Sequence, residues 1–133
     1  MIYRLLFHMN YILHCSYRKG WTERLDKFLR SKFPNVTIIP TCSLEDAILK
    51  TNQVRDNLKV AIIDQYDGKL PYDLVLAEIL KKWNKNIPII YTVSNKPIPE
   101  EYGRMFFDIF LDFGMEDAMA SLIRYINIYL NKS

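Results

Sequence analysis

The stretch Lys59-Val60-Ala61-Ile62-Ile63-Asp64 decides the fold that we expect for this chain. Four consecutive apolar residues followed by a carboxylate are typical of a strand in the middle of a parallel sheet, with helices covering both faces. The turn signal Asp67-Gly68 comes next, and a helical pattern of apolar residues then runs from Pro71 to near Trp83. These residues predict a strand, a turn and a helix, with Asp64 at the rim of the sheet.

Short apolar runs alternate with helical patterns on both sides of this unit. Strands are expected at residues 10–15, 36–39, 60–63, 87–93 and 108–111, with Pro40 closing the second. Helices are expected from Trp21 up to Pro34, over 44–51 behind a Ser43/Asp46 capping box, over 71–83, around 100–105, and over the apolar stripe from Met115 to Leu130. This alternation predicts an α/β fold of three layers, a doubly wound, parallel, five-stranded sheet of flavodoxin-like topology.

Composition indicates an ordinary globular domain and excludes several classes of protein. The 133 residues are 50% hydrophobic and 25% charged, and we expect one domain over 1–133. A net charge of +3 is too small for a dedicated nucleic-acid binder. The apolar start of the chain is too short and too interrupted to span a membrane, and residues 1–8 either extend the first strand or form a separate segment. Cys15 and Cys42 are expected to be reduced thiols in a cytoplasmic protein.

In a parallel sheet of this kind the functional crevice lies at the carboxyl ends of the strands. Asp64 is the main candidate there, because a carboxylate held rigidly after a buried strand can act as a nucleophile or bind a cation. The alternative is that Asp64 only accepts hydrogen bonds from the turn that leads to Gly68. The other strand ends contribute the pocket neighbours His14, Cys15, Thr92, Ser94 and Asp112.

The chain resembles the response-regulator receiver domain, the CheY-like family. The resemblance rests on the run 59–64, the Asp67-Gly68 turn before a helix, the segment Ile87-Pro88-Ile89-Ile90, and the order and lengths of all ten elements. It implies that Asp64 stands where the family accepts a phosphoryl group from a histidine kinase, in a signalling domain of two-component type that is not an enzyme.

The metal-binding residues of the family are not matched. Receivers end the first strand with an acidic pair that holds Mg²⁺, whereas this chain has His14 and Cys15, or Cys15 and Ser16. Imidazole and thiol groups are poor ligands for a hard cation that prefers oxygen. The resemblance therefore implies an atypical or pseudo-receiver with no cofactor, apart from weak Mg²⁺ binding at Asp64, which the residues leave open.

The switch residues differ as well. Counting from Pro88 puts Val93 where the family has threonine or serine, with Thr92 and Ser94 on either side. Leu111 and Asp112 replace the lysine and proline that follow the fifth strand in the family. The scaffold and Asp64 are retained, while the groups that support phosphorylation are degenerate.

We expect a receiver of this kind to act by binding a protein partner or a second copy of itself. In the family the fourth helix, fifth strand and fifth helix form the output face, which here carries Tyr102, Arg104, Met105, Tyr125 and Tyr129. Aromatic residues, methionine and arginine are enriched at the centres of protein interfaces. The alternative is that most of these side chains pack in the core.

Other functions remain open at this point. The main alternative is a small flavodoxin-like protein or enzyme that binds a nucleotide or cofactor in the same crevice. A zinc site is disfavoured because His14, Cys15 and Cys42 supply at most three ligands, and a buried inert thiol is favoured over a reactive one. The loop 16–20 has one glycine and no phosphate-binding motif, so a solvated loop is the favoured interpretation.

Overall fold

The computed structural model of the chain describes residues 9–68, 70–94 and 106–132, which contain one sheet of five parallel strands. The strands are β1 (Tyr11–Cys15), β2 (Thr37–Thr41), β3 (Leu58–Asp64), β4 (Ile89–Val93) and β5 (Ile109–Asp112). The helices are α2 (Lys19–Lys32), α3 (Leu44–Asn52), α4 (Tyr72–Trp83) and α6 (Ala118–Leu130), with a 3₁₀ turn, η1 (Arg55–Asn57), before β3. The strand order β2-β1-β3-β4-β5 confirms the predicted doubly wound sheet.

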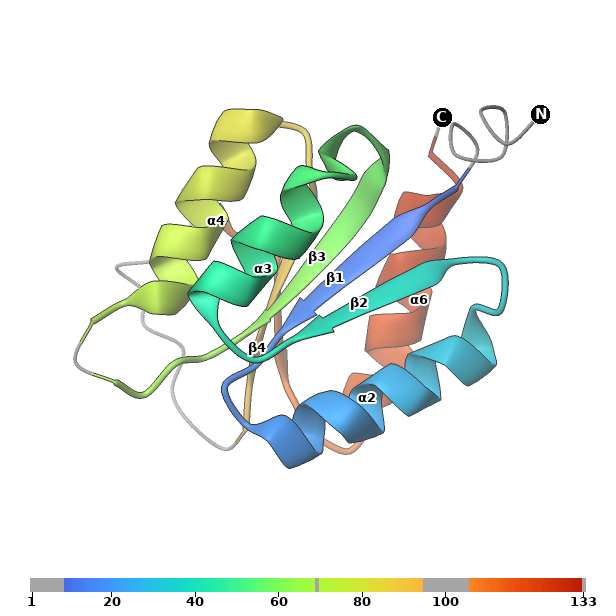
Figure 1. The fold of residues 1–133 in the computed structure, drawn as a ribbon. Helices are drawn as coiled ribbons and strands as arrows, with labels where there is room; N and C mark the ends of the chain where they lie inside the picture. Colours follow the sequence, from blue (N-terminus) through green and yellow to red (C-terminus); the bar gives the residue numbers. More distant parts are fainter. Residues whose placement is uncertain (1–8, 69, 95–105, 133) are drawn as a thin grey trace.

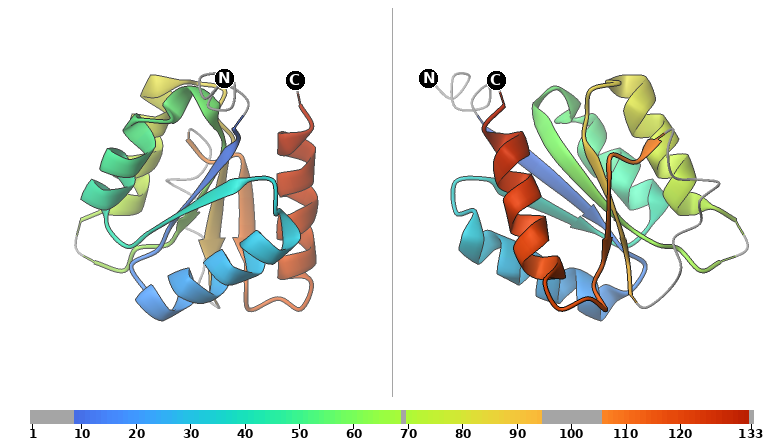
Figure 2. Two further views of the ribbon diagram at one scale, coloured as in Figure 1. Left: turned by 45° about the vertical axis from the view of Figure 1, so that its right-hand side comes forward. Right: turned by 180° about the vertical axis from the view of Figure 1, so that it is seen from behind.

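The helices form two layers around the sheet (Figure 1). Helices α3 and α4 cover one face and helices α2 and α6 cover the other, as the turned views also show (Figure 2). Each layer closes its own hydrophobic core, one around Leu76 and Leu80 of α4 and the other around Leu25 of α2 and Leu122 of α6. Strand β3 lies between β1 and β4 in the middle of the sheet, as predicted from its apolar run.

Alternation along each strand decides which core a side chain enters. In β1, Leu13 faces the core under α3 and α4, whereas Ile12 faces the core under α2 and α6. In β3, Ala61 and Ile63 likewise point to the first core and Ile62 to the second. Both faces of these strands are buried, so almost every position must be apolar. A polar residue in or next to such a run is therefore conspicuous.

Two predicted boundaries are wrong. Strand β2 does not stop before Pro40 but continues through it to Thr41. This is tolerated because β2 is an edge strand, where proline need not donate a ladder hydrogen bond on the outer side. Met115 does not belong to the buried stripe of the last helix, since it is 63% exposed in the turn before α6. That turn is closed by the backbone amide of Gly114, which donates to the carboxylate of Asp112 at 2.8 Å.

The predicted cap of the second helix is confirmed. The side chain of Ser43 accepts a hydrogen bond of 3.1 Å from the backbone amide of Asp46, as the capping pattern requires. The helical piece expected around residues 100–105 lies outside the described residues. Among the helices in the described part of the chain, none has the length and apolar character needed to cross a bilayer.

Candidate functional site

Asp64 ends β3 at the carboxyl edge of the sheet, and its residue is only 4% exposed. Both carboxylate oxygens accept hydrogen bonds from neighbouring strand ends. Thr92, which is the register partner of Asp64 on β4, donates its hydroxyl to Oδ1 at 2.9 Å. Ser16, just beyond β1, donates its hydroxyl to Oδ2 at 2.9 Å. The position predicted from the apolar run therefore carries a carboxylate that is buried and held from both sides.

The positive charge next to Asp64 comes from Arg18, the residue that precedes α2. Its Nη2 atom lies 2.8 Å and its Nε atom 3.2 Å from Oδ2 of Asp64. The same Nη2 also donates to the hydroxyl of Ser94 at 3.3 Å. Guanidinium-to-carboxylate bonds are charge-assisted and directional, so this contact both neutralises and orients Asp64.

The loop that carries Arg18 is braced by three further hydrogen bonds. The backbone amide of Arg18 donates to the hydroxyl of Ser16 at 3.2 Å, and Thr22 of α2 donates its hydroxyl to the carbonyl of Ser16 at 3.0 Å. Tyr17 donates its phenol to Asp67 at 2.6 Å, which ties this loop to the loop after β3. That hydrogen bond, with smaller contributions from burial and from the Asp67 charge, raises the pKa of Tyr17 to about 12. The guanidinium is therefore presented by an ordered loop.

Within residues 9–68, 70–94 and 106–132, no group of three or more histidine, cysteine or carboxylate side chains is gathered as a metal site would need. The hydroxyl groups of Ser16 and Thr92 donate to Asp64, and that of Ser94 accepts a hydrogen bond from Arg18. A hard divalent cation prefers several charged or carbonyl oxygens. Mg²⁺ would have to displace Arg18 from Oδ2. The carboxylate of Asp67, which lines a small pocket of about 170 Å³ together with Asp64, already accepts a hydrogen bond from Tyr17.

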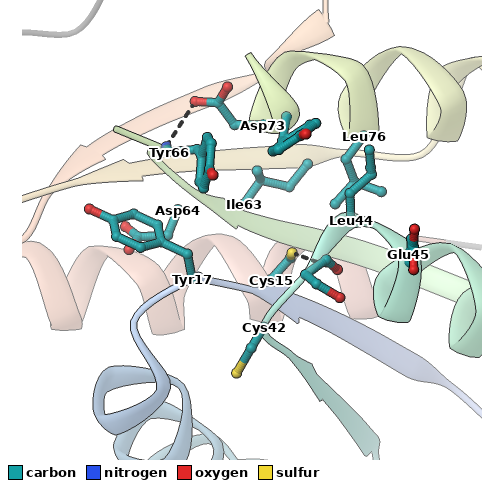
Figure 3. Close-up of a pocket in the computed structure, with 12 residues that line it drawn as sticks. Cys15, Tyr17, Cys42, Leu44, Glu45, Ile63, Asp64, Tyr66, Asp73 and Leu76 are labelled. Atoms are coloured by element: carbon teal, nitrogen blue, oxygen red, sulfur yellow. Dashed lines mark hydrogen bonds between the residues drawn. The ribbon is translucent and has the colours of Figure 1, made fainter. Parts of the chain in front are cut away.

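A cavity of about 460 Å³ opens beside Asp64, on the side of α3 and α4. Figure 3 shows Tyr17 and Tyr66 at one side of this pocket, Leu44 and Leu76 at the other, and Ile63 between them. Its volume lies within the range of small-molecule sites in proteins. The carboxyl edge of the sheet thus carries an ion pair between the buried Asp64 and the partly exposed Arg18 and, next to it, an open cavity.

Comparison with solved structures places this arrangement on a known scaffold. A receiver domain from Clostridium thermocellum matches with a TM-score of 0.78 and 14% identity, over 92% of this chain and 95% of that chain. The receiver domain of the Francisella response regulator 1452 matches with a TM-score of 0.66 and 22% identity, over 90% and 95% of the two chains. The chain has the receiver fold.

A protein of Burkholderia pseudomallei described as related to pilus assembly has a similar fold. That structure matches with a TM-score of 0.67 and 13% identity, over 91% of each chain. No protein-family model matches the sequence, and no curated protein shows significant sequence similarity to it. The likeness therefore establishes the architecture, and the site has to be argued from its own residues.

On this receiver scaffold His14 lies away from the Asp64 pocket. It continues the face of β1 that carries Ile12 and packs under α2 and α6, and it is fully buried. Neither ring nitrogen has a hydrogen-bond partner among the described residues. Burial lowers the pKa of His14 to about 4, with the charge of Asp26 opposing and that of Arg18 assisting. The imidazole is therefore neutral near pH 7.

Cys15 lines the 460 Å³ pocket together with Asp64. Its thiol lies 3.7 Å from the carbonyl oxygen of Ser43. Burial raises the pKa of Cys15 to about 11, whereas a nucleophilic cysteine needs a lowered pKa. Cys42 is exposed, and neither cysteine is in a disulfide. The geometry thus favours an inert Cys15 thiol over a reactive one.

The remaining predicted residues are spread over the fold. Thr92 and Ser94 both join the Asp64 network. Asp112 pairs in register with Val93 on β4, and β4 separates β5 from β3. On the predicted output face, Tyr125 and Tyr129 are half-buried at the edge of the core under α6. Three residues predicted for that face lie outside the described residues, namely Tyr102, Arg104 and Met105.

Sequence reasoning missed the role of Arg18 and gave Ser16 no role at Asp64. A signal was present, because the strand-end acids of the receiver pattern are absent and Arg18 is among the first basic residues after β1. A buried carboxylate needs a compensating positive charge or several donors. The nearest basic residue on an adjoining loop was therefore the candidate.

Proposed function

We propose that this chain is a cytoplasmic, receiver-like signalling domain of two-component type that acts through protein–protein interaction and without enzymatic activity. In this proposal Asp64 keeps the phosphoacceptor position but is not an efficient acceptor, because groups of the chain itself occupy it. The receiver fold supports the scaffold part of the proposal. The two unpaired thiols, Cys15 and Cys42, are consistent with a reducing compartment.

The observation that carries the proposal is the 2.8 Å ion pair between Arg18 and Asp64. Phosphoryl transfer to a carboxylate requires an oxygen that can attack phosphorus and cations that neutralise the incoming phosphoryl oxygens. Here Oδ1 is engaged by Thr92 and Oδ2 by Ser16 and Arg18. Oδ2 already accepts three hydrogen bonds, so attack on phosphorus through Oδ2 would break at least one of these contacts.

Arg18 also competes with a metal for the same oxygen. Its guanidinium is attached to the chain next to Asp64, so it competes with an ion from solution at a high effective concentration. A carboxylate in place of Ser16 would favour Mg²⁺, but the residue that follows β1 and contacts Asp64 carries a hydroxyl group. We therefore propose that the domain works with no bound cofactor and holds one conformation at the Asp64 end of the sheet.

The interaction part of the proposal concerns α6 and β5. Tyr125 and Tyr129 lie one turn apart on α6 at the border of the core, and Ile128 beside them is 45% exposed. Arg124 and Lys132 place cationic groups 5.6 and 5.3 Å from the rings of Tyr125 and Tyr129. Tyrosine and arginine are enriched among the residues that contribute most of the binding energy at protein interfaces. The partner is a second copy of this chain or another protein.

Treatment with phosphoryl donors tests the phosphoacceptor part. The full chain is incubated with acetyl phosphate or beryllofluoride in the presence of Mg²⁺, and intact mass and ¹⁹F NMR report any adduct. We expect no stable modification of the wild type, with a receiver that has the acidic pair as the positive control. A stable adduct that Asp64→Asn abolishes would overturn the proposal.

A gain-of-function variant sharpens the same test. Ser16→Asp combined with Arg18→Ala adds a carboxylate across from Asp64 and removes the guanidinium. We expect this variant to bind Mg²⁺ at least tenfold more tightly than the wild type, measured by NMR titration. Equal Mg²⁺ affinity in the two proteins would show that Arg18 does not control the site.

Sedimentation velocity tests the interaction face. A dimer that Tyr125→Ala/Tyr129→Ala dissociates supports self-association through α6. If the wild type is monomeric, the same double variant is compared with it for capture of a protein partner from the source cell. Equal behaviour of both proteins in both measurements would exclude this face.

A further inference from the structure

The 460 Å³ pocket beside Asp64 combines an apolar interior with aromatic rings and carboxylates. Leu44, Leu76 and Ile63 form its apolar part. Tyr17 and Tyr66 stand next to one another at the other side, with ring centroids 5.3 Å apart (Figure 3). Such a pocket suits a ligand that has an apolar body and one polar end.

The three tyrosines that line the pocket, Tyr17, Tyr66 and Tyr72, form what we call the tyrosine wall, in which Tyr17 and Tyr66 meet edge to face. The ring of Tyr66 lies between those of Tyr17 and Tyr72, with centroid distances of 5.3 and 5.0 Å. The phenol of Tyr17 is anchored on Asp67, and a Cβ added at Gly68 would lie 2.6 Å from the Cζ and Oη atoms of Tyr66. The ring of Tyr66 therefore rests against a residue that has no side chain. Faces of aromatic rings attract organic cations.

The charged residues that line the pocket also favour a cationic ligand. Glu45, Asp64 and Asp73 contribute carboxylates, and none of the described residues that line the pocket is basic, although the chain carries a net charge of +3. Asp64 is neutralised by Arg18, which lies outside this pocket. The carboxylates of Glu45 and Asp73 therefore make the electrostatic potential of the pocket negative.

Of these two carboxylates, that of Asp73 is the stronger indication of a cation site, because the residue is only 4% exposed. Its oxygens accept hydrogen bonds from the backbone amides of Tyr66 and Leu74 and from the phenol of Tyr91. These donors are neutral, and no lysine or arginine in the described part of the chain pairs with Asp73. A buried carboxylate without a counter-ion is stabilised by any cation that enters the adjoining cavity.

The helix ends at the pocket could favour an anion instead, because α3 and α4 both begin there. Each of these ends already carries acidic residues in its first turn, namely Glu45 and Asp46 in α3 and Asp73 in α4. Amides of both ends are engaged, that of Asp46 by Ser43 and that of Leu74 by Asp73. The positive ends of the helices are thus complemented from within the chain.

We propose that this pocket binds a small amphipathic organic cation, an amine or quaternary ammonium group on an apolar body. The apolar body lies among Leu44, Ile63 and Leu76, and the cationic head lies against the tyrosine wall near Asp73. The acidic lining disfavours a nucleotide, whose phosphates would be repelled. This site does not depend on whether Asp64 accepts a phosphoryl group.

Three probes with the same six-carbon tail test the charge of the ligand: hexyltrimethylammonium, hexan-1-ol and hexyl sulfate. Each is titrated into the ¹⁵N-labelled full chain at constant ionic strength, and the amides of Cys15, Leu44 and Ile63 report binding. We expect saturable binding of the cation, at least fivefold weaker binding of the alcohol, and no saturable binding of the sulfate. Equal affinities, tighter binding of the sulfate, or no binding of the cation would each overturn the proposal.

Matched variants locate the site. Glu45→Gln removes one exposed carboxylate at the pocket, and Glu78→Gln removes another exposed carboxylate that does not line it. We expect the first to weaken cation binding two- to fivefold and the second to leave it unchanged. Tyr66→Leu should weaken it at least fivefold, with Tyr125→Leu on α6 as the control. If both members of each pair behave alike, the cation is not bound in this pocket.

Discussion

Arg18 and Asp64 are 46 residues apart in the sequence, and their charged groups meet 2.8 Å apart at the carboxyl edge of the sheet. The side chain of Asp64 is 2% exposed and that of Arg18 is 39% exposed, so the carboxylate is buried and the guanidinium closes over it. A second Arg–Asp pair with the same 2.8 Å separation, Arg30 with Asp26, lies on the surface of α2. The two pairs differ in burial, which makes them a natural comparison.

Arg18→Ala is expected to destabilise the domain by about 1–3 kcal/mol, because it leaves a buried carboxylate without its cation. The partial exposure of Arg18 keeps this figure below the cost of breaking a fully buried pair. Arg30→Ala should cost at most about 0.5 kcal/mol, as is usual for an exposed pair one helical turn apart. Urea denaturation at pH 7 measures both. Similar losses in the two variants would mean that Asp64 does not need Arg18.

The stability of the domain is expected to fall between pH 6.5 and pH 4 because of His14. Its pKa in the folded state is lowered from 6.5 to about 4, so in this range the unfolded chain binds a proton that the folded protein excludes. From pH 7 to pH 5 this linkage removes about 2 kcal/mol, and above pH 6.5 it contributes little. Urea denaturation at the two pH values measures the difference.

The variant His14→Leu serves as the control for this pH dependence. It replaces a ring whose nitrogens have no partner among the described residues with an apolar side chain in an apolar layer. We expect it to be at least as stable as the wild type at pH 7 and to lose about 2 kcal/mol less on going to pH 5. An unchanged pH dependence in this variant would assign the effect to other groups.

The two cysteines are expected to react at very different rates with a thiol reagent such as dithionitrobenzoate at pH 8. Cys42 is exposed, whereas the pKa of Cys15 is raised to about 11 by burial, which leaves little thiolate. One fast and one slow phase should appear, and Cys42→Ser should remove the fast one. Fast modification of Cys15 in that variant would show that Cys15 is a reactive thiol and not an inert one.

Gly68→Ala is expected to weaken cation binding in the pocket strongly while lowering the free energy of unfolding only slightly. The new Cβ would press on the ring of Tyr66, which lies at the far end of a side chain that can rotate away. The loss of unfolding free energy should stay below about 1.5 kcal/mol, while binding of hexyltrimethylammonium falls at least fivefold. Gly20→Ala in α2 meets nothing within 4 Å and should stabilise the protein by up to about 1 kcal/mol. If Gly68→Ala binds the cation as tightly as the wild type does, the ring of Tyr66 does not contact the ligand.

The layered sheet and the place of Asp64 could be predicted because they depend on local patterns. Four apolar residues in a row at 60–63 require burial on both faces, and that requirement alone makes β3 a central strand. The Ser43 cap is local too, since donor and acceptor are three residues apart. The end of β2 was mispredicted because the tolerance for Pro40 depends on β2 being an edge strand.

The surroundings of Asp64 were decided by the tertiary structure. Ser16, Arg18 and Thr92 reach its carboxylate only because the register of β1, β3 and β4 brings three strand ends to one edge. The direction of His14, away from that carboxylate, likewise follows from the pleat of β1 within the assembled sheet. Short-range periodicity determines which segments are strands and helices, whereas contacts between segments tens of residues apart arise only when the whole sheet is packed.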